Sequence, residues 1–288
     1  MNPASTVDIR MGHDQEQDER LALTVDAREY LKFFRELGIE LVALSAAPVT
    51  APSDTRQIST RTDEKTTPNV RNLTQLRSSA PSVPALFGQR ELQERLQPSA
   101  ETFAAIHEEI GNCTRCPLYQ GRTQVVHTEG NRRARLMFVG EAPGADEDSL
   151  GRPFVGRAGQ LLTKIIEAIG FKREEVLIGN VNRCRPPQNR PPTFEEAKVC
   201  KPFLLREIAV VQPQVIVVLG NTALHNLTNT RVGITKVRGR FQNYKGIPVM
   251  PTYHPAYLLR DPSKKRETWE DLKKVRDYLE SLDPSNAG

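Results

Sequence analysis

Four short apolar segments separated by helical patterns constrain the fold of this chain more than any other feature. The apolar segments lie at 135–140, 176–182, 214–220 and 247–253. Helical patterns lie near 157–169, 193–210, 221–228 and 265–282. Short, continuous apolar strands that alternate with helices are typical of a parallel sheet covered on both faces. We therefore predict an α/β fold, and in such folds ligands bind at the loops that follow the strands.

The first hundred residues have a different character. Residues 20–44 carry a helical apolar pattern that Asp26 can cap. A lone amphipathic helix cannot bury its own apolar face, so we expect a helical extension over 1–45 that docks on the main domain or on a protein partner. Residues 46–100 are rich in Ser, Thr, Pro, Arg and Gln, which predicts a disordered linker. The main domain is then expected over 101–283.

Charge is distributed unevenly along the chain. Residues 1–100 contain 12 Lys and Arg and 14 Asp and Glu, a net charge of −2. The whole chain contains 40 and 35, so residues 101–288 contain 28 and 21, a net charge of +7. This excess favours a polyanionic partner such as nucleic acid, although a solvated basic surface would give the same balance.

Several classes of protein are excluded by the sequence. No apolar run reaches the ~18 residues that a membrane-spanning helix needs. The first twenty residues contain no apolar stretch of the kind found in a secretory signal. Four cysteines in 288 residues are too few for a disulfide scaffold. We expect a cytoplasmic protein whose cysteines serve a metal or redox chemistry.

The four cysteines can form one metal centre. Cys113 and Cys116 make a CxxC pair, while Cys184 and Cys200 have 15 residues between them. Four thiolates match one tetrahedral zinc or one four-cysteine iron–sulfur cluster. The wide gap before Cys184 is unlike a compact zinc ribbon, and the proline after Cys116 resembles ferredoxin runs, so the pattern favours a cluster. Unrelated buried thiols beside a chance or redox CxxC are the alternatives.

The loop after the first apolar segment demands tight turns. Residues 140–156 contain six glycines and prolines and lead into a helix start, where main-chain N–H groups can bind an anionic or carbonyl-rich ligand. No Gly-Lys-Ser/Thr follows, so this is not a Walker loop. Phe154 lies in this polar loop, and its ring can stack on a nucleobase or fill the core.

The second apolar segment ends in asparagines and arginines. Asn180 and Asn182 share one face of the predicted strand, and a buried amide needs hydrogen-bond partners or a ligand. The amide of Asn180 can donate and accept at once, which suits a pyrimidine edge as well as a structural role. Arg183, Arg185 and Arg190 are spaced to contact phosphates, or they form a solvated basic loop.

The fourth apolar segment leads into His254, a candidate for catalysis or a packed loop histidine. Tyr257, Leu258, Leu259 and Arg260 place apolar bulk beside a cation. Such a group can insert into a base stack and hold phosphate, or it can be the hydrophobic start of a helix.

Taken together, these segments resemble the family 4 uracil-DNA glycosylases, which are bacterial and archaeal repair enzymes with an iron–sulfur cluster. The matching stretches are CTRCPL at 113–118, GEAPGADEDSLGRPFVGRAGQLL at 140–162, NVNRCRPPQNRPP at 180–192 with Cys200, and TYHPAYLLR at 252–260. They occur in the family's order and cover most of residues 101–280.

The resemblance implies a three-layer α/β/α sandwich with a central four-stranded parallel sheet. It implies a monofunctional glycosylase that flips uracil out of DNA, hydrolyses its N-glycosidic bond and leaves an abasic site. We expect a monomer in the bacterial or archaeal cytoplasm, associated with the nucleoid. A [4Fe–4S] cluster would be held by four residues: Cys113, Cys116, Cys184 and Cys200.

The resemblance also assigns roles in the site. Phe154 would stack on uracil, Asn180 would read its O4 and N3–H, and His254 would bond O2 and stabilise the departing anion. Glu147 would lie near C5 and disfavour the thymine methyl group. Main-chain groups would hold uracil and the attacking water: Gly140, Ala142, Pro143 and Gly144. The gap in the duplex would be filled by three side chains: Leu258, Leu259 and Arg260.

One position departs from the wider superfamily. Many uracil glycosylases place a water-orienting aspartate where this chain has Ala142, as is usual in family 4. Glu141 lies beside it, and we expect its substitution to matter less than substitution of His254 or Asn180. The competing interpretations are a non-catalytic iron–sulfur or zinc module that binds nucleic acid and an iron–sulfur electron carrier. Neither explains why Phe154, Asn180 and His254 occur together.

Overall fold

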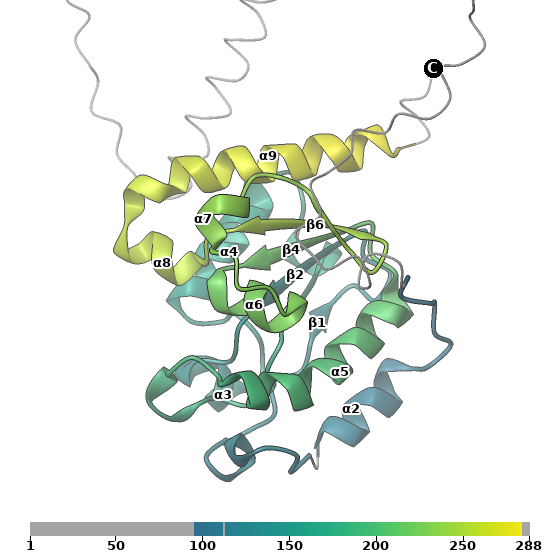
Figure 1. Ribbon diagram of the computed structural model, residues 1–288, viewed down its shortest axis with the longest axis vertical. Coiled ribbons are helices and arrows are strands. Elements are labelled where there is room, and N and C mark those ends of the chain that lie inside the picture. The colour runs from purple at the N-terminus through teal and green to yellow at the C-terminus, as the bar shows by residue number, and fades with distance from the viewer. Residues whose placement is uncertain (1–94, 112, 284–288) are drawn as a thin grey trace, which may run out of the picture.

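The structure, a computed structural model, describes residues 95–111 and 113–283 (Figure 1). The expected helical extension over 1–45, and the linker as far as residue 94, lie outside the described residues. Residues 95–100 pack on the domain instead of forming a linker. The amide of Leu96 donates to the Lys245 carbonyl at 2.9 Å, and that of Ser99 donates to the Ala209 carbonyl at 2.9 Å.

Six strands form one mixed sheet in the order β1-β3-β2-β4-β6-β5. Their bounds are Glu129–Gly130 (β1), Leu136–Gly140 (β2), Leu177–Asn180 (β3), Val215–Leu219 (β4), Gln242–Tyr244 (β5) and Ile247–Thr252 (β6). Strands β3, β2, β4 and β6 are parallel, and β1 and β5 add to the two edges in antiparallel orientation. The expected four-stranded sheet is therefore too small, because the two edge strands are too short and too polar to be recognised in the sequence.

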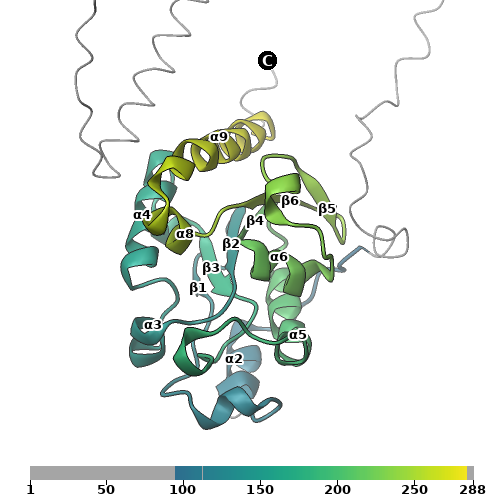
Figure 2. The ribbon, with the colours of Figure 1, turned by 60° about the vertical axis from the view of Figure 1, so that its left-hand side comes forward.

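Helices cover both faces of this sheet, as Figure 2 shows with α4 and α8 on one side and α5 and α6 on the other. The longer helices are α2 (Phe103–Gly111), α4 (Arg157–Ala168), α5 (Phe194–Val211), α6 (Asn221–Thr228) and α9 (Lys265–Ser281). The shorter ones are α3 (Ala145–Leu150), α7 (Ile234–Val237) and α8 (Pro255–Arg260). The α/β fold predicted from the apolar segments is thus observed.

Burial explains why the central strands are apolar throughout. Every residue of β2 and β4 is buried, since helices pack against both sides of the sheet. The start of α5 is fixed by a capping box, in which Thr193 accepts from the Glu196 amide and Glu196 accepts from the Thr193 amide. Among the described residues, no helix combines the length and the apolar character needed to cross a membrane.

A buried ion pair lies within this apolar frame. Arg183, in the loop after β3, donates to Glu207 on α5 and to Thr128 just before β1. Thr128 donates to Glu207 at 2.6 Å, and the ring of His107 on α2 lies 3.2 Å from the same carboxylate. Four segments that are distant in the sequence therefore meet at one charge pair.

Substitution of Glu207 by alanine tests the importance of this pair. The change leaves the Arg183 guanidinium buried without its carboxylate, so we expect the free energy of unfolding to fall by about 3–5 kcal/mol. Urea unfolding followed by circular dichroism measures the change. Glu195→Ala on the same helix is the control, since its side chain is 75% exposed and should contribute little. Equal urea midpoints for both variants would contradict the interpretation.

Candidate active site

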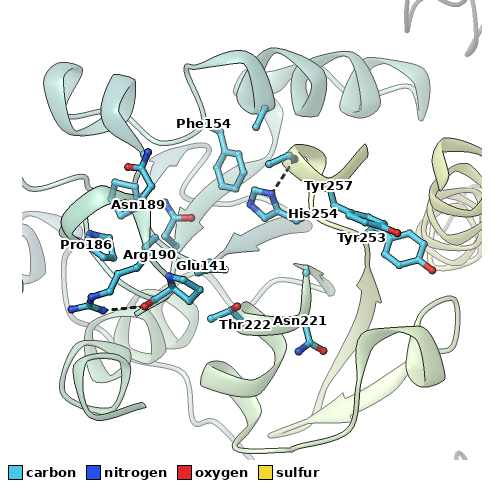
Figure 3. A pocket seen from close by; sticks show the side chains of 18 of the residues that line it. Glu141, Phe154, Pro186, Asn189, Arg190, Asn221, Thr222, Tyr253, His254 and Tyr257 are labelled. Carbon is cyan, nitrogen blue, oxygen red and sulfur yellow. Dashed lines mark hydrogen bonds between the residues drawn. The ribbon is translucent and has the colours of Figure 1, made fainter. Parts of the chain in front are cut away.

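A pocket of about 690 Å³ opens at the carboxyl ends of the parallel strands (Figure 3). Its walls come from the loop after β2, the end of β3 with its following loop, the first turn of α6 and the segment from β6 into α8. α/β folds bind their ligands at this edge of the sheet, because the loops that follow the parallel strands gather there. The pocket is therefore the first candidate for a catalytic centre.

Asn180 brings an unpaired polar atom to the pocket. It is the last residue of β3, is 2% exposed, and its Oδ1 has no hydrogen-bond partner within the part of the chain that is described. Gly140 lies opposite it in the ladder, and a Cβ there would lie 2.4 Å from Asn180 Oδ1 and 2.4 Å from Phe154 Cζ. Only glycine keeps this space open. A buried amide without a partner in a pocket wall is typical of a ligand contact.

Phe154 is held in an uncommon backbone conformation. Its φ of 53° lies in the left-handed region, and a Cβ at Gly159 would lie 1.9 Å from its carbonyl carbon. Its ring is 6% exposed and lines the pocket with its centroid 5.7 Å from that of His254, and Figure 3 shows the two rings side by side. The ring thus both fills the core and forms a flat pocket wall.

Glu147 fixes the loop that carries this ring. Its carboxylate accepts from the amides of Val155 at 2.9 Å, Gly156 at 3.0 Å and Gly144 at 3.1 Å. These bonds tie the first turn of α3 to the residues that follow Phe154. Glu147 also lines the pocket.

His254 has a defined protonation state. It caps α8, and its Nδ1 accepts from the Ala256 amide at 3.1 Å, so Nε2 carries the hydrogen of the neutral ring. Desolvation lowers the pKa of His254 to about 4, and the charge of Arg260 acts in the same direction. A Cβ at Gly220 would lie 2.9 Å from His254 Cβ, so the backbone before α6 approaches this ring closely. At neutral pH the pocket therefore holds an uncharged N–H donor.

Glu141 stands on the opposite wall of the pocket (Figure 3). Burial raises the pKa of its carboxyl group, and a hydrogen bond with the Thr222 side chain partly offsets this effect. The predicted main-chain ligand residues Ala142, Pro143 and Gly144 line the same wall.

All four cysteines line one small cavity, which is separate from the pocket that holds Asn180 and His254. Arg122, Arg183 and apolar residues of α2 and α5 also line it. None of the cysteines forms a disulfide. Arg122 donates to the Cys113 carbonyl at 2.8 Å and to Cys184 Sγ at 3.3 Å. Burial raises the pKa of the Cys116, Cys184 and Cys200 thiols, the last to about 12. Among the described residues, no three His, Cys, Asp or Glu side chains converge closely enough to hold a single metal ion.

A family model described as the uracil DNA glycosylase superfamily matches residues 127–273. The chain is 48% identical over 183 residues to the type-4 uracil-DNA glycosylase of Thermotoga maritima, a match that covers 62% of this chain and 95% of that protein. The chain belongs to the type-4 uracil-DNA glycosylase family. It is also 40% identical over 193 residues to the type-4 uracil-DNA glycosylase of Archaeoglobus fulgidus, covering 64% of this chain and 97% of that protein.

Two predictions for DNA contacts in this type-4 glycosylase are wrong. Arg183 is 1% exposed and bonded to Glu207, so it cannot reach a phosphate. Leu258 is 1% exposed and anchors α8 in the core, so it cannot enter a base stack. Leu259 on the same helix is 38% exposed.

The other predicted DNA contacts remain at the surface. Arg185 is partly buried and donates to Asn189 at 2.7 Å, while the exposed Arg190 lines the pocket and pairs with Glu196. Tyr257 lines the pocket, as does the exposed Arg260.

Sequence reasoning missed one wall of the pocket. Gly220, Asn221 and Thr222 line it at the start of α6, together with Ile234 and Thr235 of α7. A glycine directly after an apolar strand, followed by polar residues that open a helix, was the signal available for the first three. No comparable signal marks the residues of α7.

The protonation state of His254 can be tested by nuclear magnetic resonance. We expect the ring to titrate with a midpoint near pH 4 and to be a neutral Nε2–H tautomer at pH 7, because burial disfavours the charged form. Ring ¹⁵N chemical shifts recorded from pH 3.5 to 8 give the midpoint, and His254→Asn identifies the signal among the five histidines. A midpoint at or above pH 6 would contradict this description.

Proposed function

We propose that the chain flips uracil out of DNA and hydrolyses its N-glycosidic bond, leaving an abasic site from which base excision repair proceeds. The observation that carries this proposal is the unpaired, buried Asn180 Oδ1 in one pocket with Phe154 and His254. Membership of the type-4 family supports it. Flipping costs a few kcal/mol of lost stacking and pairing free energy, which the contacts of uracil in the pocket must offset.

Asn180 selects the base. Its Oδ1 accepts from uracil N3–H while its Nδ2 donates to O4. Cytosine presents an acceptor at N3 and a donor at N4, so it would meet like groups at both positions. Phe154 stacks on the base, since its ring forms a flat wall beside Asn180 and a Cβ at Gly140 would close the space between them.

His254 stabilises the leaving group. Breaking the glycosidic bond places negative charge on uracil, part of it on O2. The Nε2–H of His254 donates to that oxygen, and the bond strengthens as the charge develops. With a pKa of about 4 the ring is neutral at pH 7, so it acts as a hydrogen-bond donor and does not transfer a proton from an imidazolium.

The sugar side of the reaction needs less from the protein. A glycosidic bond that breaks through an oxocarbenium-like transition state can be attacked by a weak nucleophile. Main-chain groups of Gly140, Ala142, Pro143 and Gly144 hold the water and the base, and Glu141 orients the water. Glu147 excludes the thymine methyl group directly. It also acts indirectly, because it fixes the loop that carries Phe154.

The rim of the pocket holds the DNA. Leu259 enters the gap left by the flipped base, since it is the exposed leucine of α8, and Arg260 beside it contacts phosphate. Arg190 lines the pocket from the loop after β3, and Arg185 donates to Asn189 of the same loop. Tyr257 lies beside Arg260, whose guanidinium carbon is 6.0 Å from the centre of the Tyr257 ring, and it donates to Asp261 at 3.2 Å, which helps to hold the end of α8.

The cysteines would hold a [4Fe–4S] cluster. All four line one cavity, and none is in a disulfide. Four thiols in one cavity match the four-cysteine ligand set of such a cluster, and the resemblance to the family 4 glycosylases favours it over zinc. When bound, the cluster would cross-link Cys113, Cys116, Cys184 and Cys200. Its role would be structural, since the cysteine cavity shares no lining residue with the pocket that holds Asn180 and His254.

Three wider features complete the proposal. The chain acts as a monomer on uracil-containing DNA, and residues 1–45 bind a protein partner. The relatives compared come from a bacterium and an archaeon, so the DNA would be that of the nucleoid in the cytoplasm of such a cell. The main domain extends over 101–283 together with the residues that pack just before it.

Cleavage of an oligonucleotide with one uracil tests the function. Protein purified without oxygen is expected to make the uracil site sensitive to alkali and to contain about four irons and four sulfides per chain. The same oligonucleotide with thymine or cytosine is the control and should stay intact. Bound cluster without cleavage would refute the glycosylase activity, whereas zinc in place of iron would refute the cluster alone.

The ranking of three variants tests the division of labour in the pocket. His254→Ala and Asn180→Ala are expected to lower kcat/KM about 10²–10³-fold, the usual effect of removing a donor that stabilises developing charge. Glu141→Gln keeps the hydrogen-bonding shape and is expected to cost less than about tenfold. Single-turnover cleavage rates give the ranking, with iron content measured for each variant. An inactive Glu141→Gln that retains its iron would overturn the role assigned to Glu141.

A further inference from the structure

A second pocket, of about 340 Å³, lies at the end of α6 away from the first. Figures 1 and 2 show α6 beside α5, and residues of both helices contribute to it. The residues that line it are Phe194, His225, Asn226, Asn229, Thr230 and Arg231. None of them belongs to the pocket that holds Asn180 and His254.

Asn226 presents a buried donor to this pocket. The residue is 6% exposed, and its Nδ2 has no acceptor in the described part of the chain. Asn182 is also buried, but its Nδ2 donates to the Glu196 carbonyl at 3.1 Å. A buried donor without an acceptor is costly, so a ligand that brings a carbonyl or ring-nitrogen acceptor would be favoured.

Phe194 provides a flat apolar surface at the same place. It is the first residue of α5, directly after the capping residue Thr193, and is 53% exposed. The capping box fixes this turn, so the position of the aromatic residue is set before any ligand binds. An exposed aromatic ring beside an unpaired amide donor can stack on a nucleobase while the amide reads a polar atom of the base edge.

The rim of the pocket is basic. Arg231 is exposed and forms no ion pair with any carboxylate of the described residues. Before Arg231 the loop is held by Lys201 Nζ, which donates to Asn229 Oδ1 at 2.8 Å. After it the loop is held because the His225 ring donates to the Val232 carbonyl at 3.1 Å and the Ile234 amide donates to Asn221 Oδ1 at 2.9 Å. A free guanidinium on a fixed loop suits a phosphate.

Two segments of the chain, α6 and the loop that leads into α5, connect the two pockets. The first turn of α6 lines the first pocket and its last turn lines the second. Eight residues of helix span about 12 Å, a distance that a few nucleotides of an unpaired strand can bridge. The loop after β3 likewise lines the first pocket through Arg190 and leads into Phe194. The second pocket is therefore within reach of a strand whose uracil occupies the first.

We propose that the second pocket binds an unpaired nucleotide of the uracil-containing strand, a few positions from the uracil. The base stacks on Phe194 and accepts a hydrogen bond from Asn226 Nδ2, and the adjoining phosphate contacts Arg231. This inference depends on the proposed function in one respect: the strand that the second pocket binds must be the strand that carries uracil. It predicts tighter binding of single-stranded than of duplex DNA, because paired bases cannot enter the pocket.

Binding of fluorescent oligonucleotides by the full chain tests the proposal. The probe carries 2′-fluoro-2′-deoxyuridine, since the electron-withdrawing fluorine opposes the oxocarbenium-like transition state and prevents cleavage. Phe194→Ala is expected to weaken binding of the single strand about 5- to 100-fold, the range found for base stacking. Binding of the duplex should weaken less than about threefold. Asn226→Asp replaces the unpaired donor by an acceptor and should weaken single-strand binding as well.

A matched control and a position scan make the test specific. Leu282→Ala removes a side chain that is 41% exposed beyond the end of α9 and lines neither pocket, and it should bind as the wild type does. A series of oligonucleotides, each lacking the base at one position near the uracil, locates the contact. In the wild type one position should weaken binding, and in Phe194→Ala that loss should disappear.

Unchanged single-strand affinity in Phe194→Ala, or equal losses for single-stranded and duplex DNA, would overturn the proposal. Cleavage of a uracil oligonucleotide by the wild type and by Leu282→Ala is measured on the same preparations. Cleavage with unchanged binding by Phe194→Ala refutes the second pocket alone. Absence of cleavage with the expected pattern of binding refutes the glycosylase activity alone.

Discussion

The ion pair between Arg183 and Glu207 is the interaction on which the arrangement of the site depends. Arg183 lies directly before Cys184 and three residues after Asn180, while Glu207 lies two helical turns after Cys200 on α5. One pair therefore fixes the end of β3, and with it the residue proposed to read uracil, relative to the helix that carries a cysteine. Burying such a pair costs desolvation free energy, and removing one partner costs more. The role of the pair here is therefore to fix the positions of the segments that carry it.

The shape of the pocket depends as much on missing side chains as on those present. Gly140 leaves room for the Phe154 ring and the Asn180 amide, and Gly159 leaves room for the backbone of Phe154. Glu147 then holds that loop through three main-chain amides. The His254 ring is also fixed by a bond on its other side, because its Nδ1 accepts from the Ala256 amide.

The sequence predicted those parts of the molecule that rest on local pattern. The four parallel strands follow from apolar segments, and the positions of α4, α5, α6 and α9 follow from helical periodicity. The edge strands β1 and β5 were missed because their pairing, and not their own composition, makes them strands. The burial of Arg183 could not be predicted, since its partner Glu207 lies 24 residues away and meets it only in the folded chain. Leu258 and Leu259 are neighbours of one composition, and only the docking of α8 distinguishes them.

The attachment of residues 95–99 has a consequence for how the domain can be tethered. Leu96 pairs with the turn between β5 and β6, and Ser99 pairs with the last turns of α5. Both contacts lie at the amino-terminal edge of the parallel strands, whereas the pocket opens at the carboxyl edge. The chain thus enters the domain from behind the surface proposed to hold DNA. A protein or anchor fused before residue 95 would therefore be attached on the side of the domain opposite the proposed DNA-binding surface. The point of attachment would leave that surface uncovered.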